Sequence, residues 1–261
     1  MLTQVITNIL RKDRLCSVLA LVAVSIVAWV YTIMGVGMNM SALTMTAMPG
    51  DMPMPLGVWD IVGSVLMFAM WWVMMIAMML PSAAPMLLLF QHVSNRREAG
   101  LGSINTAVFA MGYLLIWGLF SALATVLHAF GEATGFINGM MVSASIYLSA
   151  ALLIIAGIWQ LAPQKYKCLD ACRNPVEFLS LIWRPGRLGA LRAGLLHGAF
   201  CVGCCWAMML LLFVGGVMNL YWIGGLALFV LAEKTLPLWH VTGRISGVAA
   251  IIGGVVVLVI A

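Results

Sequence analysis

The chain has 261 residues, of which 64% are apolar and 8% are charged, and its formal net charge is +5. So few polar side chains cannot cover the surface of a water-soluble domain, which excludes the soluble classes and favours a chain embedded in a lipid bilayer. The basic residues accompany the ends of apolar runs instead of forming one patch, so the charge does not indicate a nucleic-acid partner.

The first apolar run extends from Leu15 to about Met34 and is preceded by Arg11, Lys12 and Arg14. Basic residues before a span indicate a cytoplasmic N-terminus. The run is long and no small-residue cleavage site follows it closely, so we predict a retained membrane helix and not a signal peptide.

Residues 36–58 have the composition of a loop and contain neither Lys nor Arg. Six methionines lie in it: Met38, Met40, Met45, Met48, Met52 and Met54. Thioethers bind Cu(I) and remain available where oxidation would consume thiols, so we predict an extracytoplasmic Met-rich loop that collects this ion. A flexible loop in a chain that uses methionine throughout is the alternative interpretation.

The second span is expected from about Trp59 to Pro81. Four of its methionines fall within an arc of about 80° on a helix: Met67, Met70, Met74 and Met78. This stripe is either a track of metal ligands or ordinary core packing. Pro81 and Pro85 are expected to kink or end the helix.

The third span, from about Ile104 to Phe130, is predicted to return to the outer side. His128 and Glu132 lie at its end, four residues apart, so both side chains occupy one face of a helix. They form a possible outer metal site beside the Met-rich loop. Helix capping and solvation are the alternative.

The fourth span, from about Met140 to Leu161, leads to the longest polar segment, residues 162–192. Its basic residues predict a cytoplasmic loop with amphipathic segments that lie against the lipid headgroups. Cys168 and Cys172 are spaced for one face of a helix within it and form a possible cytoplasmic site for a soft ion. We do not expect a stable disulfide there, because the cytoplasm is reducing.

The fifth span contains the segment HGAFCVGCCWAM. On a helix, five donor side chains of this segment fall within an arc of about 100°: His197, Cys201, Cys204, Cys205 and Met208. Thiolate and thioether are soft ligands that select Cu(I) or zinc, so this face is the predicted metal site. Close helix packing by small apolar cysteines is the alternative.

The sixth span, from about residue 220 to residue 240, carries Glu233 and Lys234 in its inner half. Charged side chains at such depth usually face the interior of a bundle. We therefore predict a charge pair near the cysteine face, either as an interhelical salt bridge or as a group that handles protons or ions. Pro237 is expected to kink this helix, and residues 245–261 form the seventh span.

This arrangement places every Lys and Arg on one side of the membrane. The predicted fold class is therefore all-α: one polytopic transmembrane domain over residues 1–261, with about seven spans and a cytoplasmic N-terminus. The predicted location is the bacterial inner (cytoplasmic) membrane.

Three segments, MMWWVMMIAMMLPSAAPM, HGAFCVGCCWAMM and AEKTLP, resemble a bacterial family of predicted metal-binding integral membrane proteins of unknown function. The resemblance extends from about Trp59 to the C-terminus. It implies a bound metal, with six matching positions: His197, Cys201, Cys204, Cys205, Glu233 and Lys234.

The predicted function is binding of Cu(I) within the bundle, followed by transport or delivery, with copper favoured over zinc or haem. The predicted ligands are His197, Cys201, Cys204, Cys205, Met208, Met70, Met74, Met78 and Glu233. Besides the lipid bilayer and the metal ion, a membrane or periplasmic protein is a possible partner. Two alternatives remain open: a membrane thiol-redox or quinone-linked oxidoreductase, and an accessory subunit of a larger membrane complex.

Overall fold

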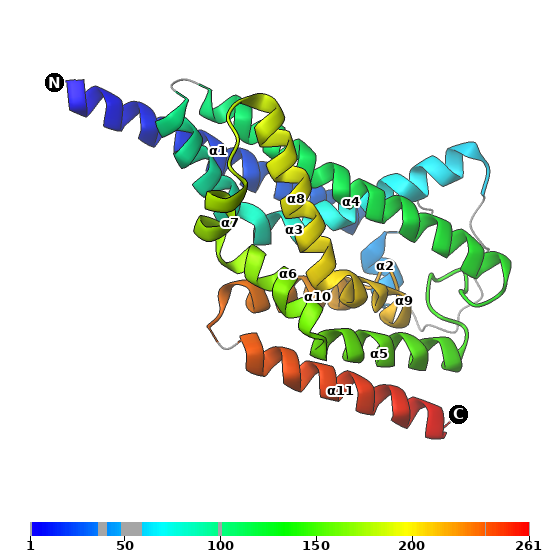
Figure 1. Cartoon of the computed structure of the whole chain (residues 1–261). Coiled ribbons are helices and arrows are strands. Elements are labelled where there is room, and N and C mark those ends of the chain that lie inside the picture. The colour runs from blue at the N-terminus through cyan, green and yellow to red at the C-terminus, as the bar shows by residue number, and fades with distance from the viewer. Residues whose placement is uncertain (1, 36–40, 48–58, 99–100, 238, 261) are drawn as a thin grey trace.

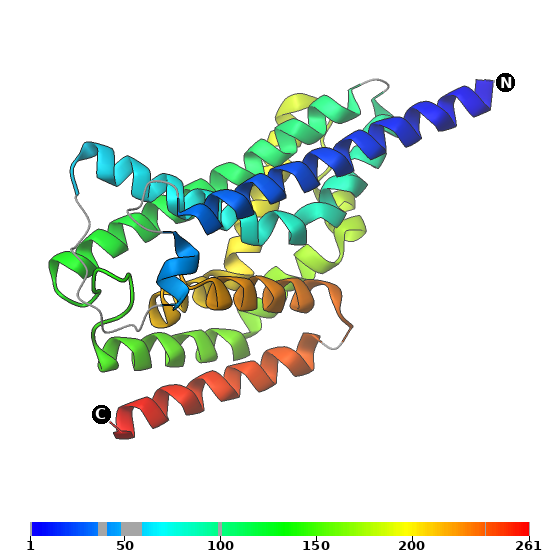
Figure 2. The ribbon, with the colours of Figure 1, turned by 180° about the vertical axis from the view of Figure 1, so that it is seen from behind.

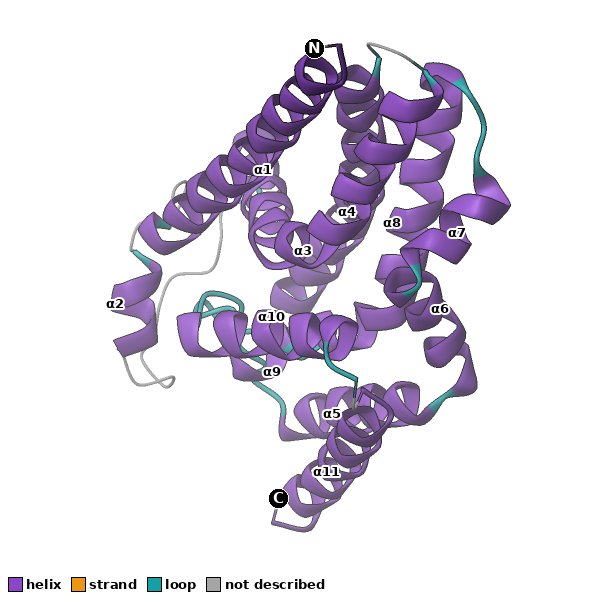
Figure 3. Cartoon of the chain, turned by 90° about the vertical axis from the view of Figure 1, so that its left-hand side faces the viewer, coloured by secondary structure: helices purple, strands orange, loops and turns teal. Residues whose placement is uncertain are grey.

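The computed structural model describes residues 2–35, 41–47, 59–98, 101–237 and 239–260. Within these ranges every regular element is a helix, as Figure 3 shows, which confirms the all-α class. The helices are α1 (Leu2–Met34), α2 (Ala42–Ala47), α3 (Ile61–Arg97), α4 (Gly102–Ala133), α5 (Ile146–Leu161), α6 (Pro163–Arg173), α7 (Pro175–Ile182), α8 (Gly186–Leu210), α9 (Leu212–Gly215), α10 (Leu220–Thr235) and α11 (Trp239–Ile260).

The long helices α1, α3, α4 and α8 form one group, with α3 packed against α1 and α4, and α4 packed against α8 (Figure 1). Helices α5 and α11 pack side by side as a second group, and α10 lies between the two groups in both Figure 1 and Figure 2. The N-terminus of α1 and the C-terminus of α11 lie at opposite ends of the molecule.

Glycines permit the closest helix crossings. A Cβ at Gly194 of α8 would lie 2.0 Å from the carbonyl oxygen of Phe109 on α4, and a Cβ at Gly157 of α5 would lie 2.6 Å from the carbonyl oxygen of Gly247 on α11. Only glycine can occupy such positions, since the backbones of the two helices are in direct contact.

Of the two outcomes expected for the prolines of the second span, a kink or the end of the helix, the second does not occur, because α3 continues through Pro81 and Pro85 to Arg97. Packing against α1 and α4 supports this part of α3. Pro237, by contrast, separates two helices: α10 ends at Thr235 and α11 begins at Trp239, so the predicted sixth span is broken there.

By length and composition, five described helices are able to cross a membrane: Leu15–Met34, Ile61–Arg97, Gly102–Ala133, Gly186–Gly215 and His240–Ile260. Helices α5 and α6 together would make a sixth, bent by 65° at the break between them. Helix α10 has 16 residues and a length of about 24 Å, shorter than the hydrocarbon layer of a typical bilayer.

The predicted Met-rich loop, residues 36–58, lies largely outside the described residues, including Met38, Met40, Met48, Met52 and Met54. Its described part contains α2, which packs against the start of α10. The backbone N–H of Leu220 donates to Thr46 Oγ1 at 2.9 Å, and Met45 is buried.

The predicted cytoplasmic loop, residues 162–192, forms α6, α7 and the first turns of α8. Helix α6 packs along α8. Lys165, one of the basic residues of this loop, is fully buried. The polar segment is therefore part of the packed structure, and it brings its cysteines to α8.

Candidate metal centre

Four cysteines on two helices form a cluster of thiols. Cys201, Cys204 and Cys205 of α8 are all buried, since their spacing puts them on the face of α8 that the bundle covers. The thiols of Cys172, Cys204 and Cys205 lie near Cys201 Sγ. We call Cys172, Cys201, Cys204 and Cys205 the thiol cluster.

Cys172 reaches the thiol cluster from α6. The sequence suggested a separate cytoplasmic site at Cys168 and Cys172, but the structure places Cys172 near Cys201 and Cys204. Gly203 permits this approach: a Cβ there would lie 2.9 Å from Cys168 Sγ. One face of α6 therefore lies on α8, and the two predicted cysteine sites adjoin each other.

A thioether also contacts the thiol cluster. Met79 of α3 is fully buried, and its Sδ lies 4.0 Å from Cys205 Sγ. The predicted stripe contained Met70, Met74 and Met78, which are buried in the same core. Met75 and Met79, four residues apart, form a second pair on the neighbouring face of α3, and this spacing is the signal by which the sequence could have identified Met79.

Lys234 and Tyr113 lie against the sulfur of Cys201. Lys234 Nζ is 3.0 Å from Cys201 Sγ and 3.0 Å from Ser82 Oγ, and the Tyr113 hydroxyl is 3.2 Å from the same sulfur. An ammonium group at this distance favours the thiolate over the thiol. The thiolate is the form in which a cysteine binds a metal ion.

The thiols of Cys204 and Cys205 are turned toward their own helix, where each donates to the carbonyl oxygen of Cys201 at 3.0 Å. Consistent with this, no group of three or more His, Cys, Asp or Glu among the described residues has the geometry of a metal site. The donor set of four thiols and a thioether nevertheless fits a soft monovalent ion, and thiol side chains turn by rotation about one bond.

His197 lies one helical turn before Cys201 in an aromatic enclosure. Its ring is 5.6 Å from Tyr113 and Phe178 and 5.9 Å from Phe109, between ring centroids. The side chain is buried, and its Nδ1 has no hydrogen-bond partner among the described residues. A buried imidazole nitrogen without a hydrogen-bond partner is a candidate metal ligand.

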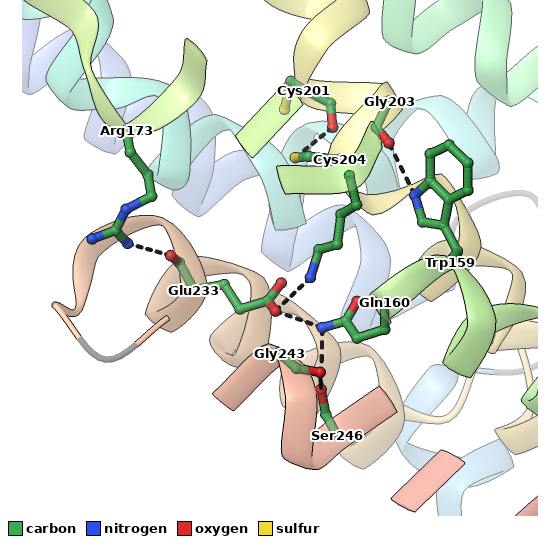
Figure 4. Close-up of polar contacts among 10 residues, drawn as sticks. Trp159, Gln160, Arg173, Cys201, Gly203, Cys204, Glu233, Gly243 and Ser246 are labelled. Atoms are coloured by element: carbon green, nitrogen blue, oxygen red, sulfur yellow. Dashed lines mark hydrogen bonds and ion pairs between the residues drawn. The ribbon is translucent and has the colours of Figure 1, made fainter. Parts of the chain in front are cut away.

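The adjacent charges Glu233 and Lys234 do not pair with each other, because they contact different helices, but Glu233 forms an interhelical salt bridge, one of the two forms expected. Glu233 Oε1 accepts from Lys165 Nζ of α6 and from Gln160 Nε2 of α5, both at 2.5 Å. Figure 4 shows Glu233 between Gln160 and Arg173, with Cys201 and Cys204 on the ribbon above. The sequence missed Lys165 as the partner, because it reads as one more basic residue of the polar segment.

The predicted outer pair is brought together by α4. His128 Nε2 lies 3.4 Å from Glu132 Oε1, and both side chains are buried, which rules out solvation, the alternative interpretation of this pair. Trp71 Nε1 donates to His128 Nδ1 at 3.4 Å, and Trp59 Nε1 donates to Glu132 Oε2 at 2.7 Å.

This outer pair and the thiol cluster are separate sites. His128 and Tyr113 are fifteen residues apart on α4, which corresponds to about 22 Å along the helix axis.

Met208 lines an apolar cavity of about 260 Å³ between α8, α10 and α11. The methionines of α3 and α8 that fill the core are Met70, Met74, Met75, Met78, Met79, Met86, Met208 and Met209.

Comparison with known proteins gives one result. Residues 68–257 match the family model described as PpoB2, copper chaperone. No curated protein and no solved structure matches the chain. The matched range runs from α3 to α11 and includes the whole thiol cluster, Met79 and Lys234. The match confirms that the chain is related to metal handling, and specifically to copper: the chain belongs to the PpoB2 family of copper chaperones.

Proposed function

We propose that this protein is a multi-pass membrane copper chaperone that binds Cu(I) at the thiol cluster and delivers it to a partner protein. The observation that carries the proposal is the convergence of Cys172 from α6 with Cys201, Cys204 and Cys205 from α8, beside Met79 of α3. Soft sulfur ligands of this kind select Cu(I) or zinc, and the family match favours copper.

Exposed apolar side chains support the membrane location. On α1, Val27 is 67% exposed and Leu19 is 58% exposed, and α11 has similar residues along its length. Two long helices with apolar outer faces would be unstable in water and are stable in lipid. We propose a single bundle in the inner membrane, crossed seven times, with α5–α6 and α10 completing the five longer spans.

The ends of the helices support a cytoplasmic N-terminus. The end of α3 and the start of α8 are tied together, since Glu98 Oε1 accepts from the backbone N–H of Gly186 at 2.8 Å and Arg97 lies over the ring of Trp183. Figure 1 shows this junction on the same side of the molecule as the N-terminus of α1. These basic segments would face the cytoplasm together.

Cu(I) binding at the thiol cluster would begin at Cys201, whose thiolate Lys234 stabilises. The thiols of Cys204, Cys205 and Cys172 would then turn from their present contacts toward the ion and lose their protons. His197, Met208 and the thioether of Met79 lie on adjoining turns of α8 and α3 as further ligands.

Copper would reach this site from the outer side. His128 and Glu132 would receive it there, after collection by the Met-rich loop, and Met70, Met74, Met78 and Met208 would carry it inward. Glu132→Gln is expected to slow copper uptake into vesicles containing the protein and to leave the equilibrium affinity of the thiol cluster unchanged.

The test is copper binding by the purified full chain in detergent. The protein is loaded with Cu(I) without oxygen, and bound copper is measured by elemental analysis and by competition with a chromophoric Cu(I) chelator. Replacement of Cys201, Cys204 and Cys205 by Ser is expected to abolish binding, whereas Cys16→Ser, an exposed thiol on α1, serves as the control. Unchanged copper content in the triple variant would refute the proposal.

A second candidate is a thiol-redox protein, and the proximity of Cys172 to Cys201 and Cys204 favours it. Within one regular helix the geometry for a disulfide is poor, but Cys172 comes from α6 whereas Cys201 and Cys204 come from α8. Oxidation of two of them would form one disulfide and pass two electrons and two protons to an acceptor such as a quinone. Alkylation of the thiols before and after mild oxidation separates the candidates, because a copper carrier needs them reduced.

A further inference from the structure

We propose that Glu233 and Lys165 form a positioning pair, which fixes α6 against α10 and so holds Cys172 in the thiol cluster. The inference rests on the proposed function, because it assigns Cys172 to the same copper site. It gives the buried carboxylate a role that is distinct from binding the metal.

The contacts of Glu233 tie α6 to α10 near both ends of α6. Lys165, in the first turn of α6, donates to Glu233 Oε1 at 2.5 Å, and both side chains are buried. Arg173, the last residue of α6, donates to the backbone carbonyl oxygen of Glu233. Cys168 and Cys172 lie between these two attachments. Their distance from α8 is therefore set by the position of Glu233.

The environment of the carboxylate is built from two further helices. Gln160 of α5 donates to Glu233 Oε1 at 2.5 Å and to Ser246 Oγ of α11 at 3.1 Å. Gly243 of α11 leaves room for the group, since a Cβ there would lie 3.3 Å from the same oxygen. Figure 4 shows these side chains around Glu233. Each neighbour restricts where the carboxylate can lie, which a positioning role requires.

Helix α6 packs on α8 through an apolar face, and the ion pair adds an attachment to α10. Leu169 is buried, and Tyr166, Cys168, Ala171 and Cys172 are partly buried against the same core. Removing one partner of a buried ion pair is unfavourable, because the other charge is left without compensation. Loss of the pair is therefore expected to loosen α6 where it is attached to α10.

The same turn of α10 also contacts α8. Lys234, the next residue, directs its ammonium group to Cys201, while Glu233 directs its carboxylate to α6. These neighbouring residues thus hold the two cysteine-bearing helices in register. When the pair with Lys165 is broken, Cys172 should withdraw while the three thiols of α8 keep their places.

The experiment measures copper protection of each cysteine by alkylation and mass spectrometry, in the full chain and in Glu233→Gln and Lys165→Met. In the unchanged protein, copper is expected to protect all four thiols of the cluster. In both variants, Cys172 is expected to react roughly tenfold faster without copper, as expected for an opened local contact, and to lose its protection by copper. Cys201, Cys204 and Cys205 should remain protected.

The control is Glu177→Gln, the same change at an exposed residue of α7, which should behave as the unchanged protein. Protection of Cys172 that persists in both variants would overturn the inference. Loss of protection at all four thiols together with loss of helix content would also overturn it, because the pair would then maintain the fold as a whole. If copper protects no cysteine in the unchanged protein, the proposed function itself fails.

Discussion

The ammonium nitrogen of Lys234 lies 3.0 Å from the sulfur of Cys201, and Ser82 Oγ accepts from the same nitrogen at 3.0 Å. Both groups are buried, so the attraction between ammonium and thiolate is weakly screened. A cation is thus already present beside the sulfur that would bind copper first.

Lys234→Met tests this relationship. Methionine retains much of the length of lysine but has no charge, so the thiolate of Cys201 loses its nearest cation. We expect alkylation of Cys201 by a small neutral reagent to slow about tenfold at constant pH, since the thiolate is the reacting form. Ser82→Ala, which removes the other hydrogen bond of Lys234, should have a smaller effect. An unchanged rate in Lys234→Met would contradict the assigned contact.

Met79→Leu tests the thioether. The substitution retains the volume of the side chain and is expected to cost less than about 1.5 kcal/mol of unfolding free energy. If Met79 Sδ helps to bind copper, the affinity for Cu(I) should fall about tenfold, which corresponds to about 1.4 kcal/mol. Met86→Leu is a matched control, since Met86 is also buried and lies seven residues further along α3. Equal affinities of the two variants would exclude Met79 as a ligand.

Substitution of two glycines, one at a helix crossing and one away from any neighbour, tests the packing of the helices. Gly194→Ala would force α4 and α8 apart, because the new Cβ would lie 2.0 Å from a carbonyl oxygen of α4, and we expect a loss of about 1–3 kcal/mol. Gly225→Ala on α10 meets no atom within 4 Å and should be neutral or stabilise by up to about 1 kcal/mol. Thermal unfolding in detergent, followed by circular dichroism, measures both. Similar melting temperatures for the two variants would contradict the packing of α4 on α8.

The seven-span topology predicts opposite locations for the two termini. Because the number of spans is odd, the N-terminus should lie in the cytoplasm and the C-terminus outside it. An alkaline phosphatase fused after residue 261 should be active, and a fluorescent protein that folds only in the cytoplasm should be dark at the same position. The reverse result would indicate six spans, the number obtained when α10 does not cross the membrane.

Much of the fold could be predicted because helical periodicity and apolar length are local properties. The spacing of Cys201, Cys204 and Cys205 predicted one buried face of α8, and the cost of charge in an apolar segment predicted that Glu233 and Lys234 would be buried. The course of α3 beyond Pro81 could not be predicted in this way. Packing along neighbouring helices supports that segment, and such support is absent from a local pattern.

The amino-acid sequence by itself determined that this chain is an all-helical, strongly apolar protein with a row of soft donors on one helix, because each of these properties depends on the order of residues within a few helical turns. Only the tertiary structure decided that Cys172 and Met79 join this row and that Glu233 pairs with Lys165, 68 residues away in the sequence. These contacts depend on how helices cross, and the crossings are set by close packing at positions such as Gly194 and Gly203. Packing of this kind is a property of the assembled bundle, so no single segment contains it.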